Sequence, residues 1–567
     1  MKRTLLLTVM LAATAGAMAC TNFIVGKKAS ADGSVICSYS ADSYGMFTGL
    51  RHQPAAKHQK GDMRKIYEWD TNKYLGEIPE AEETYNTIGN INEWQVTIGE
   101  TTFGGREEMV DTTGIIDYGS LIYITLQRAK TAREAISIMT TLVEQYGYCS
   151  EGETFTICDP NEAWIMEMMG AWVPDSVKAT LKPSARRQLG RTVWVALRVP
   201  DDMICGHANQ SRITTFMPAK GQKKQKAGEE TVLWSKNVVS YARLMGWYKG
   251  TDEAFSYNAA YAAPDFSGRR ICDARVWQFF NRYADGMDRY LPWAEGIEKD
   301  AEPMPLWVKP NKKVSVADVR EAMRDHFENT PLSLDDPDDI GGGIWEMPYR
   351  PTPLFFEVDG VKYFNERPVS TQQAGFVYVS QMRSWLPREV GGCFWFANDD
   401  GNMVPFTPVY CCTNKAPRPY NTPGADDLHF SFDNAYWVQN WVSNMVYPRY
   451  SMLFPSLKEV RDSLDASYAR AQKEVEDRAL TLSGAARVDY LTGYAAQKAD
   501  QMLARWRDLA TYLIVKYNDM ISKPEENGQF TKTPYGFGST VKRPGYSEKY
   551  ARQLVKRMGK RYAYPKE

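Results

Sequence analysis

The feature that most constrains this chain is Cys20, which stands between an apolar leader and two β-rich segments. A positively charged start, an apolar run from Leu5 to Ala15 and the tripeptide Ala17-Met18-Ala19 follow one another in the order of a secretory signal peptide with an A-x-A cleavage site. We therefore expect residues 1–19 to be removed on export, which makes Cys20 the first residue of a periplasmic or secreted protein.

Two short strands are predicted directly after Cys20. Thr21 to Val25 and Val35 to Ser40 are rich in β-forming residues, and Ala31-Asp32-Gly33-Ser34 between them carries a turn signal. A cysteine that opens the first strand of such a hairpin is held by the strand ladder on one side only. Its thiol and a freed α-amine are then able to face a cleft.

A cysteine with a free α-amine carries its own general base. The thiolate is the reactive form of cysteine, the free thiol has a pKa near 8.5, and an α-amine titrates at about 7.7 to 8. The amine of Cys20 is thus able to take the proton of its own thiol, as in other amino-terminal nucleophiles. Two alternatives stay open: a buried structural cysteine, and a lipid-modified cysteine, which normally follows a Leu-like residue where this chain has Ala17.

Several separated motifs resemble those of a known family. In chain order they are CTNFIVGKKASADGSVICSYSADSYG (20–45), NINEWQVTIGETTFGG (90–105), GETFTICDPNEAWIMEM (152–168), GHANQSRI (206–213), RDHFENTPL (324–332), SWLPREVGG (384–392) and FSFDNAYW (430–437). Together they resemble the dipeptidase A family of cysteine N-terminal-nucleophile (Ntn) hydrolases, distant relatives of bile salt hydrolases and penicillin V acylases. The resemblance implies a four-layer αββα sandwich, dipeptide substrates and no cofactor.

The resemblance also implies residues that assist Cys20. Asp42 stands where the related acylases place an aspartate after the hairpin, and we expect it to hold the α-amine of Cys20. Asn209 matches an asparagine that the wider superfamily uses near the oxyanion, where a side-chain amide contributes about 2.7 to 4 kcal/mol in other hydrolases. The alternatives are a solvated turn residue for Asp42 and a loop asparagine that caps its own turn for Asn209.

Four further positions are expected to contact the substrate. The chain departs from its relatives at Tyr39, where they commonly carry an arginine next to the thiol. Either another arginine supplies that charge or the thiol relies on its amine. Arg212 is a candidate for binding a substrate carboxylate. Glu100 and Thr102 lie where superfamily members place an oxyanion or substrate contact, although the residue types differ from the asparagine of the acylases.

The segment between Gly147 and Pro200 and the helix before it predict the fold class. Thr131 and Glu134 form a capping box at the start of a helix. Strands are predicted at Phe155–Cys158, Ala163–Met168 and Thr192–Val199. Segregated strands and helices of this kind are expected for an α+β fold in which sheets pack face to face under helical layers.

From residue 451 to residue 567 the pattern changes to long helices and a basic tail. Ser456 to Glu459 is a capping box, and a break at Ser483-Gly484 predicts a hairpin of two helices packed on the main domain, residues 20–450. The tail from Lys523 onward is rich in Lys and Arg, and we expect a solvated extension.

Composition limits the partners of the chain. It has 68 Lys and Arg against 69 Asp and Glu, which gives no electrostatic reason to expect nucleic acid or an anionic membrane. No apolar run after the leader approaches the roughly 20 residues of a membrane-spanning helix. Five scattered histidines and the lack of a C-x-x-C pair predict no metal site, and we expect at most one or two disulfide bridges.

Two rival functions remain open at this point. The same chemistry suits an acylase that cleaves N-acyl substrates such as bile salts or penicillin V. A non-catalytic exported protein with this fold would instead bind peptides without turning them over. Small peptides are the expected ligands of a dipeptidase or of such a binding protein, and a homo-oligomer is compatible with the sequence.

Overall fold

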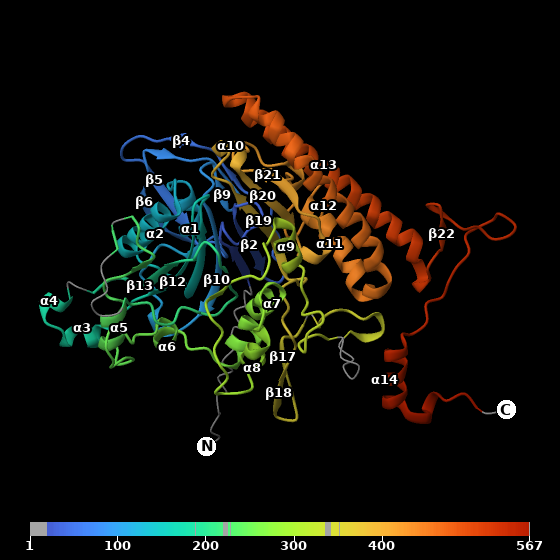
Figure 1. The fold of residues 1–567 in the computed structure, drawn as a ribbon, viewed down its shortest axis with the longest axis horizontal. Coiled ribbons are helices and arrows are strands. Elements are labelled where there is room, and N and C mark those ends of the chain that lie inside the picture. Colours follow the sequence, from blue (N-terminus) through green and yellow to red (C-terminus); the bar gives the residue numbers. More distant parts are fainter. Residues whose placement is uncertain are drawn as a thin grey trace, which may run out of the picture.

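Two large antiparallel sheets form the centre of the molecule, and helices flank them (Figure 1). The computed structural model of the chain describes residues 20–186, 189–218, 225–226, 228–334, 342–350 and 352–565. The predicted signal peptide, residues 1–19, lies outside this part.

The first sheet has seven strands and contains the segment that begins at Cys20. Across the sheet the strands are β16 (Trp307–Val308), β14 (Ile204–His207), β1 (Thr21–Val25), β2 (Val35–Asp42), β19 (Ala374–Met382), β20 (Gly392–Asn398) and β21 (Thr407–Tyr410). The predicted hairpin is confirmed, with Thr21 opposite Ser40. The strand β2 runs two residues further than predicted, so Asp42 is its last residue and not part of a turn.

The second sheet has eight strands. Across the sheet they are β15 (Val232–Trp234), β13 (Thr192–Arg198), β12 (Ala163–Gly170), β11 (Gly152–Cys158), β10 (Thr97–Gly104), β9 (Ile91–Asn92), β8 (Thr87–Ile88) and β3 (His52–Gln53). The three strands predicted between residues 155 and 199 are therefore present, and β11 begins three residues earlier than expected.

The two sheets pack against each other through β1 and β2 on one side and β10 and β11 on the other. At Gly99 of β10 the approach is so close that an added Cβ would lie 2.3 Å from Oδ1 of Asn22 and 3.2 Å from Cβ of Tyr39. A side chain at this position would push the sheets apart, which explains a glycine inside a strand. Apolar side chains, among them Ile24 and Ile165, belong to one buried cluster that joins the sheets.

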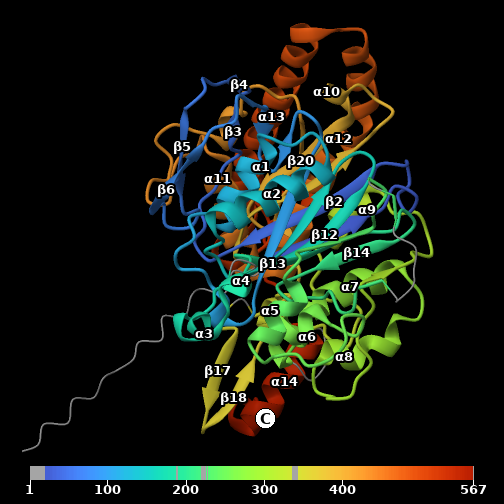
Figure 2. The same cartoon turned by 90° about the vertical axis from the view of Figure 1, so that its left-hand side faces the viewer.

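Helices α1 (Tyr118–Leu126) and α2 (Ala132–Tyr146) contact the second sheet through β10, β11 and β13 (Figure 2). Thr131 caps α2 as predicted, because its hydroxyl accepts a hydrogen bond from the backbone N–H of Glu134. The second half of the box differs, since the Glu134 carboxylate accepts from the N–H of Lys130 and not from that of Thr131.

Other helices cover the first sheet. They are α7 (Ala274–Tyr283), α9 (Val316–Ala322) and α11 (Ala435–Val446). Phe23 of β1 stacks on Phe279 of α7 with ring centroids 4.1 Å apart. Because the sheets are antiparallel and the helices lie beside them instead of connecting parallel strands, the fold class is α+β, as predicted.

Two long helices follow, α12 (Tyr450–Leu480) and α13 (Gly484–Tyr517), and they pack on each other and on β21 (Figure 1). They are joined at the predicted break before Gly484. The start of α12 was predicted wrongly, because the helix begins six residues before Ser456 and Ser456 caps nothing. Pro455 lies inside α12, where it lacks the N–H of a normal helical residue.

Shorter elements surround this core. The small hairpins pair β4 (Ala56–Lys57) with β7 (Glu83–Thr84), β5 (Met63–Tyr67) with β6 (Tyr74–Pro79), β17 (Phe355–Val358) with β18 (Val361–Phe364) and β22 (Glu525–Glu526) with β23 (Gln529–Phe530). The short helices are α3 (Asp175–Thr180), α4 (Pro183–Arg186), α5 (Val238–Leu244), α6 (Tyr257–Tyr261), α8 (Leu291–Glu295), α10 (Arg388–Gly391) and α14 (Glu548–Met558).

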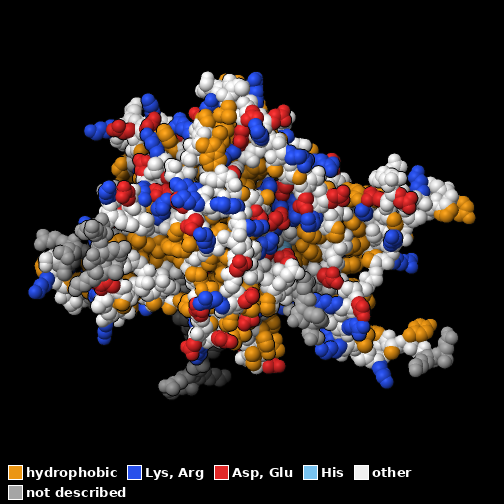
Figure 3. All heavy atoms as spheres, viewed as in Figure 1, with side chains coloured by type: hydrophobic (Ala, Val, Ile, Leu, Met, Phe, Trp, Pro, Cys, Tyr) orange, Lys and Arg blue, Asp and Glu red, His pale blue; other side chains and the backbone are white. Residues whose placement is uncertain are grey.

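The surface carries charges of both signs. On the face drawn in Figure 3, Lys and Arg side chains are intermixed with Asp and Glu side chains, and hydrophobic areas lie between them. Among the described residues no helix combines the length and the apolar character that a bilayer crossing requires. All nine cysteines are free thiols.

Candidate active site

Cys20 lies at the open edge of the second sheet. Strand β10 pairs with β9 only at Thr97, so the rest of this edge faces the first sheet. Along this edge, side chains donate hydrogen bonds to three alternate backbone carbonyl groups of β10. The Tyr378 hydroxyl donates to the carbonyl of Ile98 at 3.2 Å. The Asn22 amide donates to the carbonyl of Glu100 at 2.6 Å, and the Asn209 amide to that of Thr102 at 2.8 Å. These bonds fix β10 against the start of β1 and hold the Glu100 side chain beside Cys20.

The Cys20 thiol is completely buried among acidic and phenolic groups. Its Sγ lies 3.6 Å from Oε1 of Glu100 and 3.7 Å from the hydroxyl of Tyr39, and that hydroxyl donates a short hydrogen bond to the same Glu100 oxygen. Burial raises the pKa of the Cys20 thiol, and the charges of Glu100 and Asp42 raise it further. These surroundings favour the protonated form of the thiol.

Arg275 places a buried positive charge beside the main chain of Cys20. The Arg275 guanidinium is buried, and its Nη1 donates to the Cys20 carbonyl oxygen at 2.7 Å. Its Nη2 donates to Oδ1 of Asn209 at 2.9 Å. Burial lowers the pKa of Arg275 to about 10, so the group stays charged at neutral pH. Arg275 was not among the residues predicted from the sequence.

The local geometry of Arg275 comes from an irregular helix start. Before α7 the chain forms a π-helical turn, Gly268–Asp273, and the Nε of Arg275 donates to the carbonyl of Ile271 at 3.0 Å. Such π turns occur often at functional sites, where they change the direction of a side chain. No motif around Arg275 reveals its partners, because Cys20 lies 255 residues away in sequence.

Asp42 closes the other side of the thiol. Its backbone N–H donates to the Cys20 sulfur. Its Oδ2 accepts from Nη2 of Arg367 at 2.6 Å and from the hydroxyl of Ser40 at 3.1 Å, whereas Oδ1 is buried without a donor from the described residues. Burial raises the pKa of Asp42, and the charge of Arg367 opposes that rise.

Asn209 links the two sheets beside Cys20. It follows β14 and has a left-handed backbone with φ of 57°, a conformation that asparagine tolerates better than most residues. Thr102, whose carbonyl accepts from Asn209, directs its own hydroxyl to Oε2 of Glu153 at 3.0 Å. Six of the seven residues predicted from the sequence are thus close together: Cys20, Tyr39, Asp42, Glu100, Thr102 and Asn209.

Arg212 is the exception. Its guanidinium donates to the carbonyl groups of Gly206 and Pro305 at 2.7 Å each, and its Nε lies 3.3 Å from the carboxylate of Asp273. These contacts hold the Arg212 side chain in a buried position, where it stabilises the fold. The expectation that Arg212 binds a substrate carboxylate therefore finds no support in its position.

His207 has a structural role as well. Its Nδ1 lies 2.8 Å from the hydroxyl of Thr101, and its Nε2 lies 2.7 Å from that of Thr156. Burial lowers the pKa of His207 to about 3, so the ring is neutral. Within the described ranges no group of three or more His, Cys, Asp or Glu side chains is arranged to hold a metal ion.

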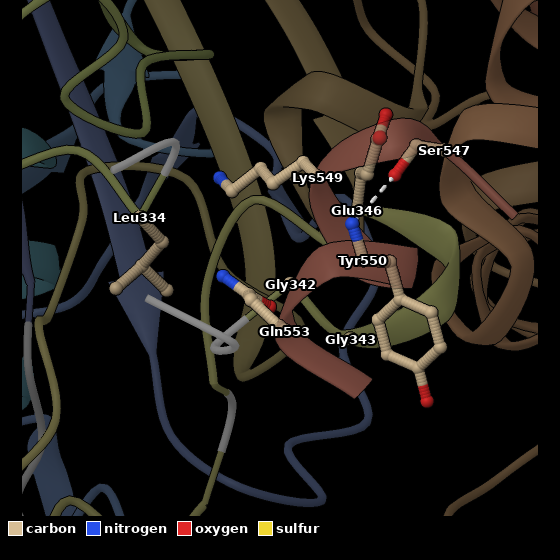
Figure 4. A pocket seen from close by; sticks show the side chains of 8 residues that line it. All are labelled: Leu334, Gly342, Gly343, Glu346, Ser547, Lys549, Tyr550 and Gln553. Atoms are coloured by element: carbon tan, nitrogen blue, oxygen red, sulfur yellow. Dashed lines mark hydrogen bonds between the residues drawn. The ribbon is translucent and has the colours of Figure 1, made fainter. Parts of the chain in front are cut away.

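A separate pocket lies between the segment around Gly343 and helix α14 (Figure 4). Its lining consists of Leu334, Gly342, Gly343, Glu346, Ser547, Lys549, Tyr550 and Gln553. None of the residues around Cys20 borders it, so we assign it no part in the site.

Comparison with known proteins identifies relatives over most of the chain. The family model described as Peptidase family C69 matches residues 19–68 and 48–462. A probable dipeptidase of Salmonella dublin is 24% identical over 435 residues, which cover 72% of this chain and 85% of that protein. A probable dipeptidase of Latilactobacillus sakei is 23% identical over 521 residues, or 88% of this chain and 95% of the relative. A dipeptidase of Bifidobacterium longum is 23% identical over 428 residues, or 69% and 71%.

Proposed function

The chain belongs to peptidase family C69, and on this premise we propose that it is an exported cysteine dipeptidase that begins at Cys20 after removal of residues 1–19. The observation that carries the proposal is the position of Cys20. The residue that follows the A-x-A site is also the residue on which Glu100, Tyr39 and Arg275 converge. The names of the C69 relatives support dipeptides as substrates.

In the proposed reaction the Cys20 sulfur attacks the carbonyl carbon of the dipeptide. The thiol proton passes through the freed α-amine to the leaving nitrogen, the carbon–nitrogen bond breaks and a thioester remains. Water then adds its hydroxyl to the acyl carbon, and its proton returns to the sulfur. The raised pKa of the buried thiol makes an adjacent base necessary, and the α-amine on the same residue provides it.

Asp42 and Asn209 support these steps. Cleavage before Cys20 creates an α-amine next to Asp42, whose buried Oδ1 has no donor within the described chain and is able to accept an N–H of this amine. We assign Asp42 to hold this group. Asn209, which Arg275 fixes at 2.9 Å, is assigned to stabilise the oxyanion together with backbone N–H groups.

The layer order also supports an Ntn hydrolase. Two sheets packed face to face, with α1 and α2 on one and α7, α9 and α11 on the other, have the arrangement of a four-layer αββα sandwich. In this arrangement the N-terminal strand β1 lies inside the first sheet and directs Cys20 to the edge of β10.

The first experiment determines the mature N terminus by intact mass, which tests processing at Cys20, lipidation and export together. The second compares the mature protein with Cys20→Ala and Cys20→Ser on free dipeptides, N-acyl amino acids, bile-salt conjugates and penicillin V. We expect cleavage of dipeptides by the wild type alone. Full turnover by either variant would show that Cys20 is not the nucleophile. A preference of the wild type for N-acyl substrates would favour an acylase. Binding of peptides without cleavage would favour a non-catalytic peptide-binding protein.

A further inference from the structure

Two buried carboxyl groups stand side by side next to Cys20. Glu100 of β10 is 1% exposed and Glu153 of β11 is 0% exposed. Glu153 lies opposite Thr102 in the strand pairing, which makes it the diagonal neighbour of Glu100 on the same face of the sheet. In the part of the chain that the structure describes, neither carboxylate forms an ion pair with a lysine, an arginine or a histidine.

The two carboxyl groups also contact each other. Oε1 of Glu100 accepts from Tyr39 and from the Cys20 thiol, and Oε2 of Glu153 accepts from the hydroxyl of Thr102. Oε2 of Glu100 and Oε1 of Glu153 have no donor from another residue of the described chain, and the two carboxyl groups hydrogen-bond to each other. Such a bond requires a proton on one of the two groups. The pair is therefore held together by a proton, whose place a cation with N–H donors is able to take.

The surroundings of the pair favour a cation. The titratable groups that interact with the two carboxyl groups include Cys20, Tyr39, Asp70, Tyr118, Tyr148 and Glu151, which are all acids. The site also holds the cation Arg275, which donates to the Cys20 carbonyl. Burial raises the pKa of Glu100, and burial followed by the charge of Glu100 raises the pKa of Glu153, which agrees with a proton shared between the two groups.

We propose that Glu100 and Glu153 bind the α-ammonium group of the substrate's N-terminal residue and so restrict the enzyme to peptides with a free amino end. This inference rests on the proposed function, since it takes Cys20 as the nucleophile. The distances agree with it. In an aminoacyl group the nitrogen lies about 2.5 Å from the carbonyl carbon, and an attacking atom approaches that carbon to about 3–3.5 Å. With Oε1 of Glu100 at 3.6 Å from Sγ, the ammonium of a reacting substrate falls within reach of the pair.

The same geometry separates peptides from N-acyl compounds. An ammonium group offers three N–H donors, enough for one oxygen of each carboxyl group and a third acceptor. An N-acyl nitrogen offers one neutral N–H and adds a bulky group at the same place. An N-acyl substrate therefore leaves the two carboxyl groups without a compensating positive charge. A site built to bind a polar group rejects an analogue that lacks this group.

The kinetic test uses the mature chain, Glu153→Gln and the control Glu253→Gln, which changes an exposed glutamate in the loop before α6. Glu153 is chosen over Glu100 because Glu100 also contacts the thiol. The substrates are alanyl-alanine and lactoyl-alanine, in which a hydroxyl replaces the ammonium. We expect the wild type and Glu253→Gln to prefer alanyl-alanine in kcat/KM, and Glu153→Gln to lower this preference on the order of 10²-fold.

A binding test does not depend on turnover. Calorimetry of alanyl-alanine with Cys20→Ala, near pH 7 in two buffers of different ionisation enthalpy, is expected to show release of about one proton, because the ammonium displaces the shared one. Cys20→Ala with Glu153→Gln is expected to lose this release. A merely structural role of Glu153 would change stability and leave the proton count unchanged.

The outcomes separate the two hypotheses. Equal kcat/KM for both substrates in the wild type, or unchanged preference and proton release in the Glu153→Gln proteins, overturns the ammonium site and leaves the nucleophile intact. Absence of cleavage by the wild type, or turnover by Cys20→Ala, overturns the proposed function. In that case preferential binding of alanyl-alanine over lactoyl-alanine still supports the ammonium site, and equal binding rejects it.

Discussion

The Arg275 guanidinium donates a hydrogen bond of 2.7 Å to the carbonyl oxygen of Cys20. A second bond, of 2.9 Å, joins the same guanidinium to the side chain of Asn209. One buried cation thus sets the relative position of the proposed nucleophile and of the proposed oxyanion donor. Since the guanidinium contacts the main chain of Cys20 and not its sulfur, its first effect is on geometry.

Replacing Arg275 by Met is expected to lower kcat/KM for a dipeptide by about 10²–10³-fold, because the Cys20 carbonyl and Asn209 lose their common donor. Arg275→Lys keeps the charge but not the planar fork, so we expect it to recover little of the rate. Steady-state kinetics beside thermal unfolding checks this. A lysine variant with wild-type kcat/KM would show that charge alone suffices.

Gly99→Ala is expected to destabilise the fold by about 1–3 kcal/mol and to reduce activity, because the new Cβ would lie 2.3 Å from Asn22 and 3.1 Å from the Tyr378 hydroxyl. Asn22 holds the carbonyl of Glu100, so its displacement disturbs the site. The control is Gly493→Ala in α13, where nothing lies within 4 Å of the added Cβ and a gain of about 0.5–1 kcal/mol is expected. Equal denaturation midpoints for the two variants would refute the close sheet contact.

The sequence predicted the parts of the site that depend on local pattern. The hairpin after Cys20 follows from two β-rich runs around a turn, and its register brings Tyr39 and Asp42 to the same end of the sheet as Cys20. The family resemblance, confirmed by the C69 match, covered the positions of Glu100 and Asn209. In these cases a short motif carries the information.

The remaining parts depend on contacts that no short motif records. Arg275 and Glu153 come from elements whose local sequence shows no partner for them. Arg212 lies three positions after Asn209 in sequence, but its guanidinium contacts the carbonyl of Gly206 and the carboxylate of Asp273. Sequence proximity fixes neighbours along the backbone and not the direction of a side chain.

Asp42 and Arg367 form a buried ion pair of 2.6 Å with side chains 0% and 3% exposed. Asp42→Asn and Arg367→Met are each expected to destabilise the protein by about 3–5 kcal/mol. Each substitution removes the charge that compensates the buried charge of the other residue. The double variant is expected to lose less than the two single losses together. Urea unfolding of the four proteins measures this coupling, and strictly additive losses would contradict it.

His207 is expected to make the folded state sensitive to acid. Its pKa is about 3 in the folded chain and about 6.5 when unfolded, so below pH 6.5 the unfolded chain binds a proton that the folded chain does not. The free energy of unfolding therefore falls as the pH falls from about 6.5 to about 3, with a slope approaching 1.4 kcal/mol per pH unit. Above about pH 6.5 this group adds no pH dependence.

Comparison with His207→Gln isolates this effect, because glutamine keeps hydrogen-bonding atoms near Thr101 and Thr156 and does not titrate. Burial raises the pKa of Glu167 to about 7, which gives a trend of the opposite direction, but that trend is common to both proteins and cancels in their difference. Urea unfolding at several pH values should show a stability difference, wild type minus variant, that is constant above about pH 6.5 and declines below it. Parallel curves down to about pH 4 would mean that His207 is protonated in the folded protein, and then its two threonine contacts could not both be those of a neutral ring.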